Sequence, residues 1–165
     1  MRRAPLFLLM AAATACASGN GAVPAPFPTP GPAAPRLDPP LEPADRPALV
    51  GTALSLRGAP YRNGGSDPSG FDCSGFVAYV FAQQGLYMPR TVSEQFAQGQ
   101  PVNQDEVAPG DLVFFSTVAA GASHVGIAIS RDEFVHAPSS NGVVRVESLS
   151  APYWSSRFVG TRRIR

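Results

Sequence analysis

The sequence predicts an α+β fold, in which helices pack on a mainly antiparallel β-sheet. Two observations support this prediction. Between residues 45 and 99, three segments carry apolar residues at helical spacing. From residue 111 onward, short segments rich in Val, Ile and Phe alternate with turn residues. A chain in which helices come first and strands follow is typical of an α+β domain.

Residues 1–16 have the features of an export signal. The segment starts with the basic "MRR", continues with the apolar "APLFLLMAAATA" and ends in small residues. This apolar run is too short for a transmembrane helix, which needs about 20 residues. The "ATAC" segment resembles a bacterial lipobox, although Ala13 stands where leucine is usual, and it predicts lipidation of Cys16. Cleavage by a general signal peptidase after Ala15 or Ala17 is the alternative.

Residues 17–45 form a predicted proline-rich linker, and residues 46–165 a single folded domain. Ten of the 18 prolines lie between Pro24 and Pro47. A segment so rich in proline cannot pair its backbone groups or bury a core, so it is expected to be extended. It is either a spacer that holds the domain away from a membrane or a terminus without a function.

The first predicted helix runs from Asp45 to Gly58. Asp45 can cap its first turn, Pro47 suits the start of a helix, and Gly58 can end it. The following segment, residues 59–70, is dense in Gly, Pro, Asn and Asp and is predicted to be a loop.

Two further helices follow this loop. The segment "CSGFVAYVFAQQG" begins with Cys73, keeps its large apolar residues on one face, and ends at Gly85. A shorter helix covers residues 91–99, where Thr91 and Glu94 have the spacing of a capping box.

The second half of the domain predicts five strands. They are the segments "DLVFFST", "HVGIAIS", "EFVHAP", "GVVRVESL" and "RFVGTRRI", separated by turn residues. No internal repeat accompanies them.

Composition excludes several classes of function. The formal net charge of +1 gives no bulk attraction to nucleic acid, so no nucleic-acid partner is expected. The chain has two cysteines and two histidines, Cys16, Cys73, His124 and His136, without the close pairs of a zinc site. No metal and no cofactor is therefore predicted. Once processing has used Cys16, no partner is left in the domain for a disulfide to Cys73.

Cys73 is either a small packed residue or a nucleophile. Its predicted place at a helix N-terminus favours the nucleophile, because the helix dipole and unpaired N–H groups lower a thiol pKa. A thiolate nucleophile also needs a base and a group that orients the base. His124 and His136 lie 12 residues apart in one predicted hairpin, where they can face each other across neighbouring strands. One imidazole could then contact the thiol while the other holds it.

Several motifs together resemble those of the NlpC/p-sixty family of cell-wall peptidases. They are "DCSGFVAYVF", "MPRTVSEQF", "PGDLVFF", "HVGIAI" and "FVHAP", and they occur in the family's order. The resemblance covers roughly Pro47 to Arg165. It implies a compact papain-like cysteine peptidase fold of the α+β class.

The resemblance also implies roles for the reactive residues. Cys73 matches the nucleophile, His124 the base, and His136 the third polar residue, which orients the base. Tyr61 matches a tyrosine near the thiolate in many members, whose hydroxyl could stabilise the oxyanion.

Further matching positions concern the substrate groove. Asp72 and Ser74 match positions that shape the substrate pocket. Arg90, with Thr91 and Gln95, matches a polar cluster near that groove; a helix cap and ordinary surface residues are the alternative for these three.

The implied activity is hydrolysis of amide bonds in peptidoglycan stem peptides, between D-glutamate and the diamino acid or at the cross-links. The stem peptides are then the substrate partner, and a lipid on Cys16 would anchor the protein to a membrane. Ala17 favours the outer membrane, with the domain facing the periplasm. Alternatives are a related papain-like cysteine amidase or acyltransferase acting on another amide, and an inactive wall-binding module.

Overall fold

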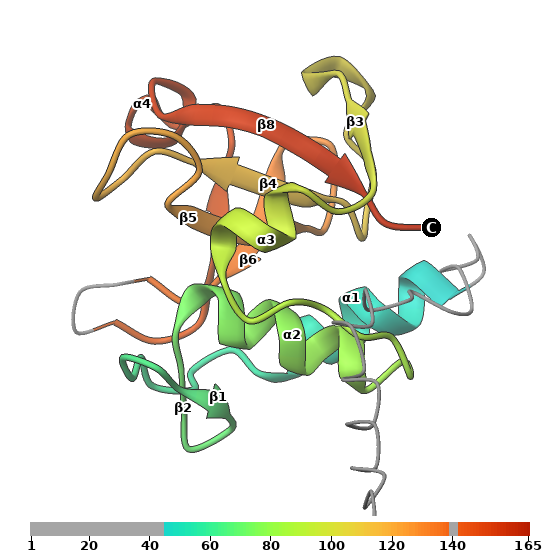
Figure 1. Ribbon diagram of the computed structural model, residues 1–165, viewed down its shortest axis with the longest axis vertical. Coiled ribbons are helices and arrows are strands. Elements are labelled where there is room, and N and C mark those ends of the chain that lie inside the picture. The colour runs from blue at the N-terminus through green and yellow to red at the C-terminus, as the bar shows by residue number, and fades with distance from the viewer. Residues whose placement is uncertain (1–44, 139–141) are drawn as a thin grey trace, which may run out of the picture. The chain divides into compact units, whose positions relative to one another are not determined.

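A computed structural model describes residues 45–138 and 142–165 of the protein (Figure 1). The predicted signal at 1–16, Cys16 and nearly all of the predicted linker lie outside the described residues. Within the described ranges, no helix has the length and apolar character needed to cross a membrane.

The three predicted helices are confirmed as α1 (Arg46–Ser55), α2 (Cys73–Ala82) and α3 (Val92–Phe96). The capping box of α3 is formed, since Thr91 Oγ1 accepts the Glu94 N–H and the Glu94 carboxylate accepts the Thr91 N–H. The predicted cap on α1 is wrong. Asp45 has a helical backbone, and its side chain makes no capping hydrogen bond.

The sheet has six strands in the order β3-β8-β4-β5-β6-β7, and every neighbouring pair is antiparallel. The five predicted strands are confirmed. Their bounds are β4 (Leu112–Phe115), β5 (His124–Ala128), β6 (Glu133–His136), β7 (Arg145–Ser148) and β8 (Phe158–Arg163). The α+β class with an antiparallel sheet is thereby confirmed.

Five short elements were not predicted. The edge strand β3 (Gln100–Val102), the 3₁₀ turn η2 (Gln104–Glu106) and the helix α4 (Pro152–Ser155) lack a clear periodic pattern. The predicted loop before α2 also contains a small hairpin of β1 (Ser66–Asp67) and β2 (Gly70–Phe71).

The sheet buries both of its faces, in two separate apolar clusters. One face packs against α1 and α2, which lie together on one side of the sheet in Figure 1. The other face packs against Trp154 of α4. All five residues of β5 are buried as a result. Because side chains alternate along a strand, Val125 and Ile127 face the helices, whereas Ala128 faces the Trp154 cluster.

A fully buried carboxylate joins the first helix to the last strand. Asp111 accepts hydrogen bonds from Arg163 Nε at 2.9 Å and Nη2 at 2.7 Å, and from Arg46 Nη1 at 3.2 Å. The Ala108 N–H donates a further bond of 2.9 Å to the same carboxylate. Its charge is therefore balanced by two guanidinium groups that come from opposite ends of the domain.

Asp111→Ala should lower the free energy of unfolding by about 2–4 kcal/mol, because it leaves two partly buried cations and one backbone N–H without their acceptor. Urea denaturation of the full chain measures this. Asp105→Ala is the matched control, since Asp105 is exposed, and it should change the free energy by less than about 0.5 kcal/mol. Equal effects of the two variants would show that the ion pairs at Asp111 do not stabilise the fold.

Candidate active site

Cys73 is the first residue of α2, and the residues around it fix the start of this helix. The Asp72 side chain caps the helix by accepting the Gly75 N–H at 2.7 Å. The Asp72 N–H in turn donates to the Gly65 carbonyl at 3.1 Å. A Cβ on Gly75 would lie 2.0 Å from that carbonyl oxygen, so only glycine allows the preceding loop to pass this close.

The thiol of Cys73 is partly buried and lies against the start of β5. Burial of the sulfur, followed by the charge of the Asp72 carboxylate, raises the pKa of the Cys73 thiol. The nearby backbone N–H groups of Val125, Ser74 and Cys73 itself lower this pKa by less, so the net shift is upward. The predicted lowering of the thiol pKa is therefore wrong, because burial and the capping carboxylate outweigh the helix N-terminus.

The two histidines are in direct contact. His124 Nε2 lies 2.7 Å from His136 Nδ1, and both side chains are buried. The register pairs Ile127 with Val135, which places His136 opposite Gly126 and diagonal to His124. The predicted meeting across neighbouring strands is confirmed, with this diagonal offset.

Aromatic rings hold the histidine pair. The Trp154 ring stacks on His124 with centroids 5.5 Å apart and 25° between the planes. It meets His136 nearly edge-on, with centroids at 4.9 Å. Because Trp154 belongs to the short helix α4, this unpredicted element sets the orientation of both imidazoles.

Both imidazoles are neutral at pH 7. Burial lowers the pKa of His124 to about 4. Burial, followed by the charges of His124 and Arg145, lowers the pKa of His136 to about 2. In the tautomer in which His124 Nε2 donates to His136, His124 Nδ1 carries a lone pair that can accept a proton. The other ring nitrogen of His136, Nε2, is buried and lacks a hydrogen-bond partner among the described residues.

The Cys73 thiol and the His124 imidazole flank the same end of β5. Cys73 contacts the backbone of Val125, the residue that directly follows His124. Within the described residues, no hydrogen bond joins the thiol to the imidazole of His124. Catalytic hydrogen bonds are often long without substrate and shorten in the complex.

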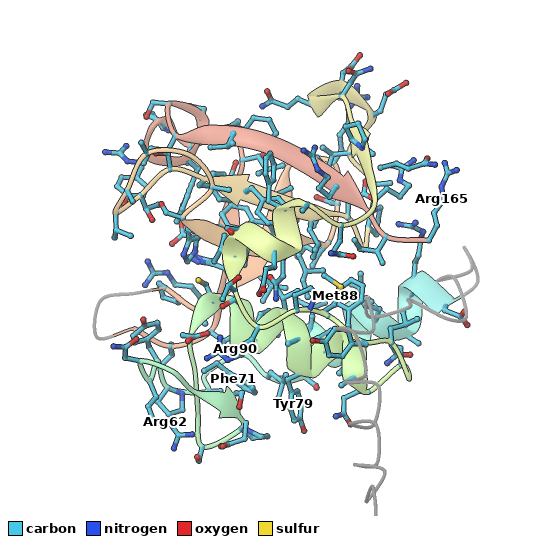
Figure 2. All side chains as sticks on the ribbon, in the orientation of Figure 1. Arg62, Phe71, Tyr79, Met88, Arg90 and Arg165 are labelled. Carbon is cyan, nitrogen blue, oxygen red and sulfur yellow. The ribbon has the colours of Figure 1, made fainter. Side chains whose placement is uncertain are left out.

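Three of the predicted substrate-groove residues form one network beside the thiol. Arg90 donates to the two Asp72 oxygens at 2.9 and 2.5 Å and to Ser74 Oγ at 2.9 Å. Figure 2 shows Arg90 beside the start of α2. Burial and the charges of Cys73 and Asp72 raise the pKa of Tyr61, so its hydroxyl stays protonated and can donate. The structure thus brings Tyr61, Asp72, Ser74 and Arg90 to one side of the thiol.

The remaining two residues of the predicted polar cluster have structural roles. Thr91 caps α3. Gln95 is fully buried, and its Nε2 donates to the Ser74 carbonyl at 3.0 Å and to the Pro89 carbonyl at 2.7 Å. Gln95 thereby holds α3 and the Arg90 segment against the nucleophile helix. Asp72 likewise has a helix-capping role that the sequence reading did not assign, although Asp before a helix start is a usual N-cap.

A second feature was missed altogether, a cavity of about 390 Å³ next to the His124 ring. Arg145 and Glu147 of β7 line it together with Trp154. Nothing in the sequence pattern singles out these charged residues, because their place beside the histidines depends on the register of β6 with β7.

The described residues contain no group of three or more His, Cys, Asp or Glu side chains arranged to hold a metal ion. The side chains gathered at the site are a thiol, a neutral imidazole pair, a tyrosine hydroxyl and a guanidinium–carboxylate pair.

Residues 58–163 match the family model described as the NlpC/P60 family. The chain is 44% identical over 109 residues to the murein DD-endopeptidase MepS/murein LD-carboxypeptidase of Escherichia coli K12, covering 66% of this chain and 57% of that protein. It is 43% identical over 112 residues to the probable endopeptidase NlpC of the same organism, covering 67% of this chain and 72% of that protein. The chain thus spans just over half the length of the first of these relatives.

Solved structures show the same likeness. The NlpC/p60 domain of the peptidoglycan hydrolase SagA matches with a TM-score of 0.63 and 34% identity, over 72% of this chain and 97% of that one. A Staphylococcus aureus protein of the NLP/P60 family, described as similar to lipoprotein, matches with a TM-score of 0.67 and 30% identity, over 77% of this chain and 44% of that one. Motifs and fold agree with these matches, and the chain belongs to the NlpC/P60 family.

Proposed function

We propose that residues 46–165 form a catalytic domain that hydrolyses amide bonds in the stem peptides of peptidoglycan. The observation that carries this proposal is the thiol at the start of α2, held against the start of β5 beside the contacting pair His124 and His136. Relatives named as murein endopeptidases and a peptidoglycan hydrolase domain support the choice of substrate.

The first chemical step begins from a neutral pair. His124 Nδ1 takes the proton of the Cys73 thiol as the sulfur attacks the amide carbon. The backbone N–H at the start of α2 and the Tyr61 hydroxyl donate to the developing oxyanion. His136 accepts the His124 Nε2–H, which keeps the base in the tautomer that this step requires.

The second step releases the amine. The imidazolium of His124 gives its proton to the leaving nitrogen as the carbon–nitrogen bond breaks, which leaves the acyl group on Cys73. His124 then takes a proton from water, and the resulting hydroxide attacks the thioester carbon. The carbon–sulfur bond breaks, the acyl group leaves as a carboxylic acid, and the His124 imidazolium returns its proton to the Cys73 thiolate. In this scheme Arg90, Asp72 and Ser74 bind the acyl part of the substrate, since they lie on the thiol side of the site.

For the N-terminal residues, we propose a lipoprotein signal at 1–16, a lipid on Cys16 and a proline-rich tether at 17–45. The protein would then act in the cell envelope, anchored to the outer membrane and facing the periplasm. The "ATAC" segment and Ala17 support this location.

Digestion of purified peptidoglycan with the full chain, followed by mass spectrometry of the fragments, tests the activity and identifies the bond. Release of cleaved stem peptides supports the proposal. If the fragments are unchanged while the protein binds peptidoglycan, the domain is a binding module. If cleavage occurs only in other amides, the substrate class is wrong.

Cys73→Ala and His124→Ala should each reduce cleavage of wall peptides by about 10³-fold or more, because each removes a group that makes or breaks a bond. His136→Asn should cost less, about 10–100-fold, because it keeps a polar group that can orient His124. Rates of fragment release measure these effects, and circular dichroism checks the fold. Arg131→Ala, in an exposed turn, is the matched control. Activity that survives Cys73→Ala would show that Cys73 is a packed residue and not the nucleophile.

Alkylation of Cys73 by iodoacetamide should be slower at pH 7 than that of a free cysteine and should increase only as the pH rises above the ordinary thiol range. The reason is that the thiol pKa is raised, so the thiolate fraction at pH 7 is small. The pKa of about 4 keeps His124 neutral above roughly pH 5. The kcat/KM value should therefore fall only below that pH on the acid side. Rapid alkylation with a plateau extending below pH 6 would instead indicate a thiolate–imidazolium pair.

Cys16→Ser should move the protein from the membrane fraction to a soluble or unprocessed form, because the lipid is attached through that sulfur. Cell fractionation with immunoblotting measures the shift. Ser18→Ala, two residues further on, is the control and should leave the distribution unchanged. A wild-type protein that is already soluble outside the inner membrane would contradict lipidation.

A further inference from the structure

An apolar groove lies along α1, in a part of the domain that the proposed mechanism does not use. Its volume is about 540 Å³, which is within the range of binding pockets, about 300–1,000 Å³. Helix α1 contributes Val50, Gly51 and Leu54 to its lining, and the segments that flank β4 and β5 contribute Pro109 and Ile129. The described residues that line the groove include none of the active-site residues named above.

Gly51 leaves a gap in α1 on the side that lines the groove. The residues that the structure describes place no atom within 4 Å of a Cβ built on Gly51. Glycine inside a helix is less favourable than alanine, and packing within the described domain gives no steric reason for it. A chain segment that passes close to the helix at this point would give one.

The groove is held in shape by contacts within the domain itself. Arg46 Nη1 donates to the Pro109 carbonyl at 3.2 Å and to Asp111 Oδ1 at 3.2 Å, which ties the start of α1 to the turn before β4. Leu49 and Ala53 are fully buried in the core and fix α1 in place. A segment that binds to such a preformed groove causes little reorganisation of the domain.

The chain that precedes α1 has a segment of the right length to fill this groove. Residues 37–41, "LDPPL", stand just before the described domain and carry two leucines and two prolines. The groove follows α1 from Arg46 to Leu54, a length of about 12 Å at 1.5 Å per residue. In a polyproline conformation, at about 3.1 Å per residue, about four residues span that length. A turn over residues 42–45 would reverse the chain and bring the segment alongside the helix.

Charge and attachment also favour this segment. Arg46 is the one charged residue among the described residues that line the groove, and it is cationic. The charged residues of 37–43 are Asp38 and Glu42, both acidic. Because the segment is joined to α1 by a few residues, its effective concentration at the groove is high, of millimolar order for short linkers. Weak apolar contacts are therefore enough to hold it there.

We infer that residues 37–41 fold back along α1 and dock in this groove. Leu37 and Leu41 contact the apolar lining, and the backbone between them passes close to Gly51. The free part of the linker then ends near Arg36, so the docked segment fixes where the tether leaves the domain. This inference does not depend on the proposed hydrolysis.

Trypsin digestion of the full chain tests the docking at a single bond. Arg36 is the one arginine between residues 4 and 45, and the chain has no lysine. Cleavage of the Arg36–Leu37 bond requires an undocked chain, so its rate follows the undocked population. The wild-type protein should be cut about 10-fold more slowly than a free peptide of residues 30–44, which corresponds to about one undocked molecule in ten. Mass spectrometry of the fragments over time measures the rate.

Two variants should restore the fast rate. Gly51→Gln fills the groove with a side chain and also improves the helix propensity of α1. Leu41→Ser removes an apolar contact from the segment. Their matched controls should keep the slow rate. They are Ala48→Gln, at an exposed position of the same helix, and Val23→Ser, elsewhere in the linker. Circular dichroism during thermal melting checks that all four variants fold.

Methyl NMR of the full chain gives a second readout that does not depend on a protease. Leu41→Ser should shift the methyl signals of the groove residues Val50, Leu54 and Ile129, because it removes the side chain that contacts them. Val23→Ser should leave these three signals where they are in the wild-type protein.

The outcomes are distinct. Equal cleavage of the wild-type protein and both variants, at the rate of the free peptide, would overturn the docking. Protection that persists in Gly51→Gln would also overturn it, because the segment would then bind elsewhere on the domain. Protection that increases with protein concentration would assign the groove to a second copy of the chain and overturn docking within one chain. The hydrolase proposal stands in each of these cases.

Discussion

The site depends on the contact between the start of α2 and the start of β5. This contact places the Cys73 sulfur near the backbone N–H of Val125, the residue that follows His124. It is kept by residues that do no chemistry: the Asp72 cap, the close approach at Gly75, and the Gln95 amide on the Ser74 carbonyl. Helix and sheet come from different halves of the chain, so a loss of packing between them would separate nucleophile and base without changing either residue.

Among the described residues, no carboxylate forms a hydrogen bond with the His124 imidazole, whose partner is His136. Two neutral imidazoles share one hydrogen bond on a buried face, under the ring of Trp154. A carboxylate there would raise the pKa of His124, whereas His136 orients it and leaves burial in control of its protonation. In the proposed mechanism, the proton that His124 accepts would therefore create a charge only transiently, because the buried site favours its transfer to the leaving nitrogen.

The sequence predicted the parts of this arrangement that are local. Cys73 lies at a helix start, and His124 and His136 lie in one hairpin. Each of these two placements follows from a sequence pattern of a few residues. The predicted lowering of the thiol pKa was wrong because it considered the helix dipole but neither the burial of the sulfur nor the charge of Asp72. Both of these depend on how the chain folds. The sequence did not predict that three further residues lie beside the histidines: Arg145, Glu147 and Trp154. Their positions are set by strand register and by a helix of one turn. The edge strand β3 was missed for a similar reason, since its polar and proline residues resemble a loop.

The buried carboxylate of Asp111 has a consequence for the order in which the domain can open. It joins Arg46, where the described chain begins its first helix, to Arg163 near the end of the last strand, and Arg46 also reaches the Ile164 carbonyl. Because the first helix and the last strand share this carboxylate, fraying at either end would leave a buried charge without its partners. Both ends of the domain should therefore open together with the core and not ahead of it.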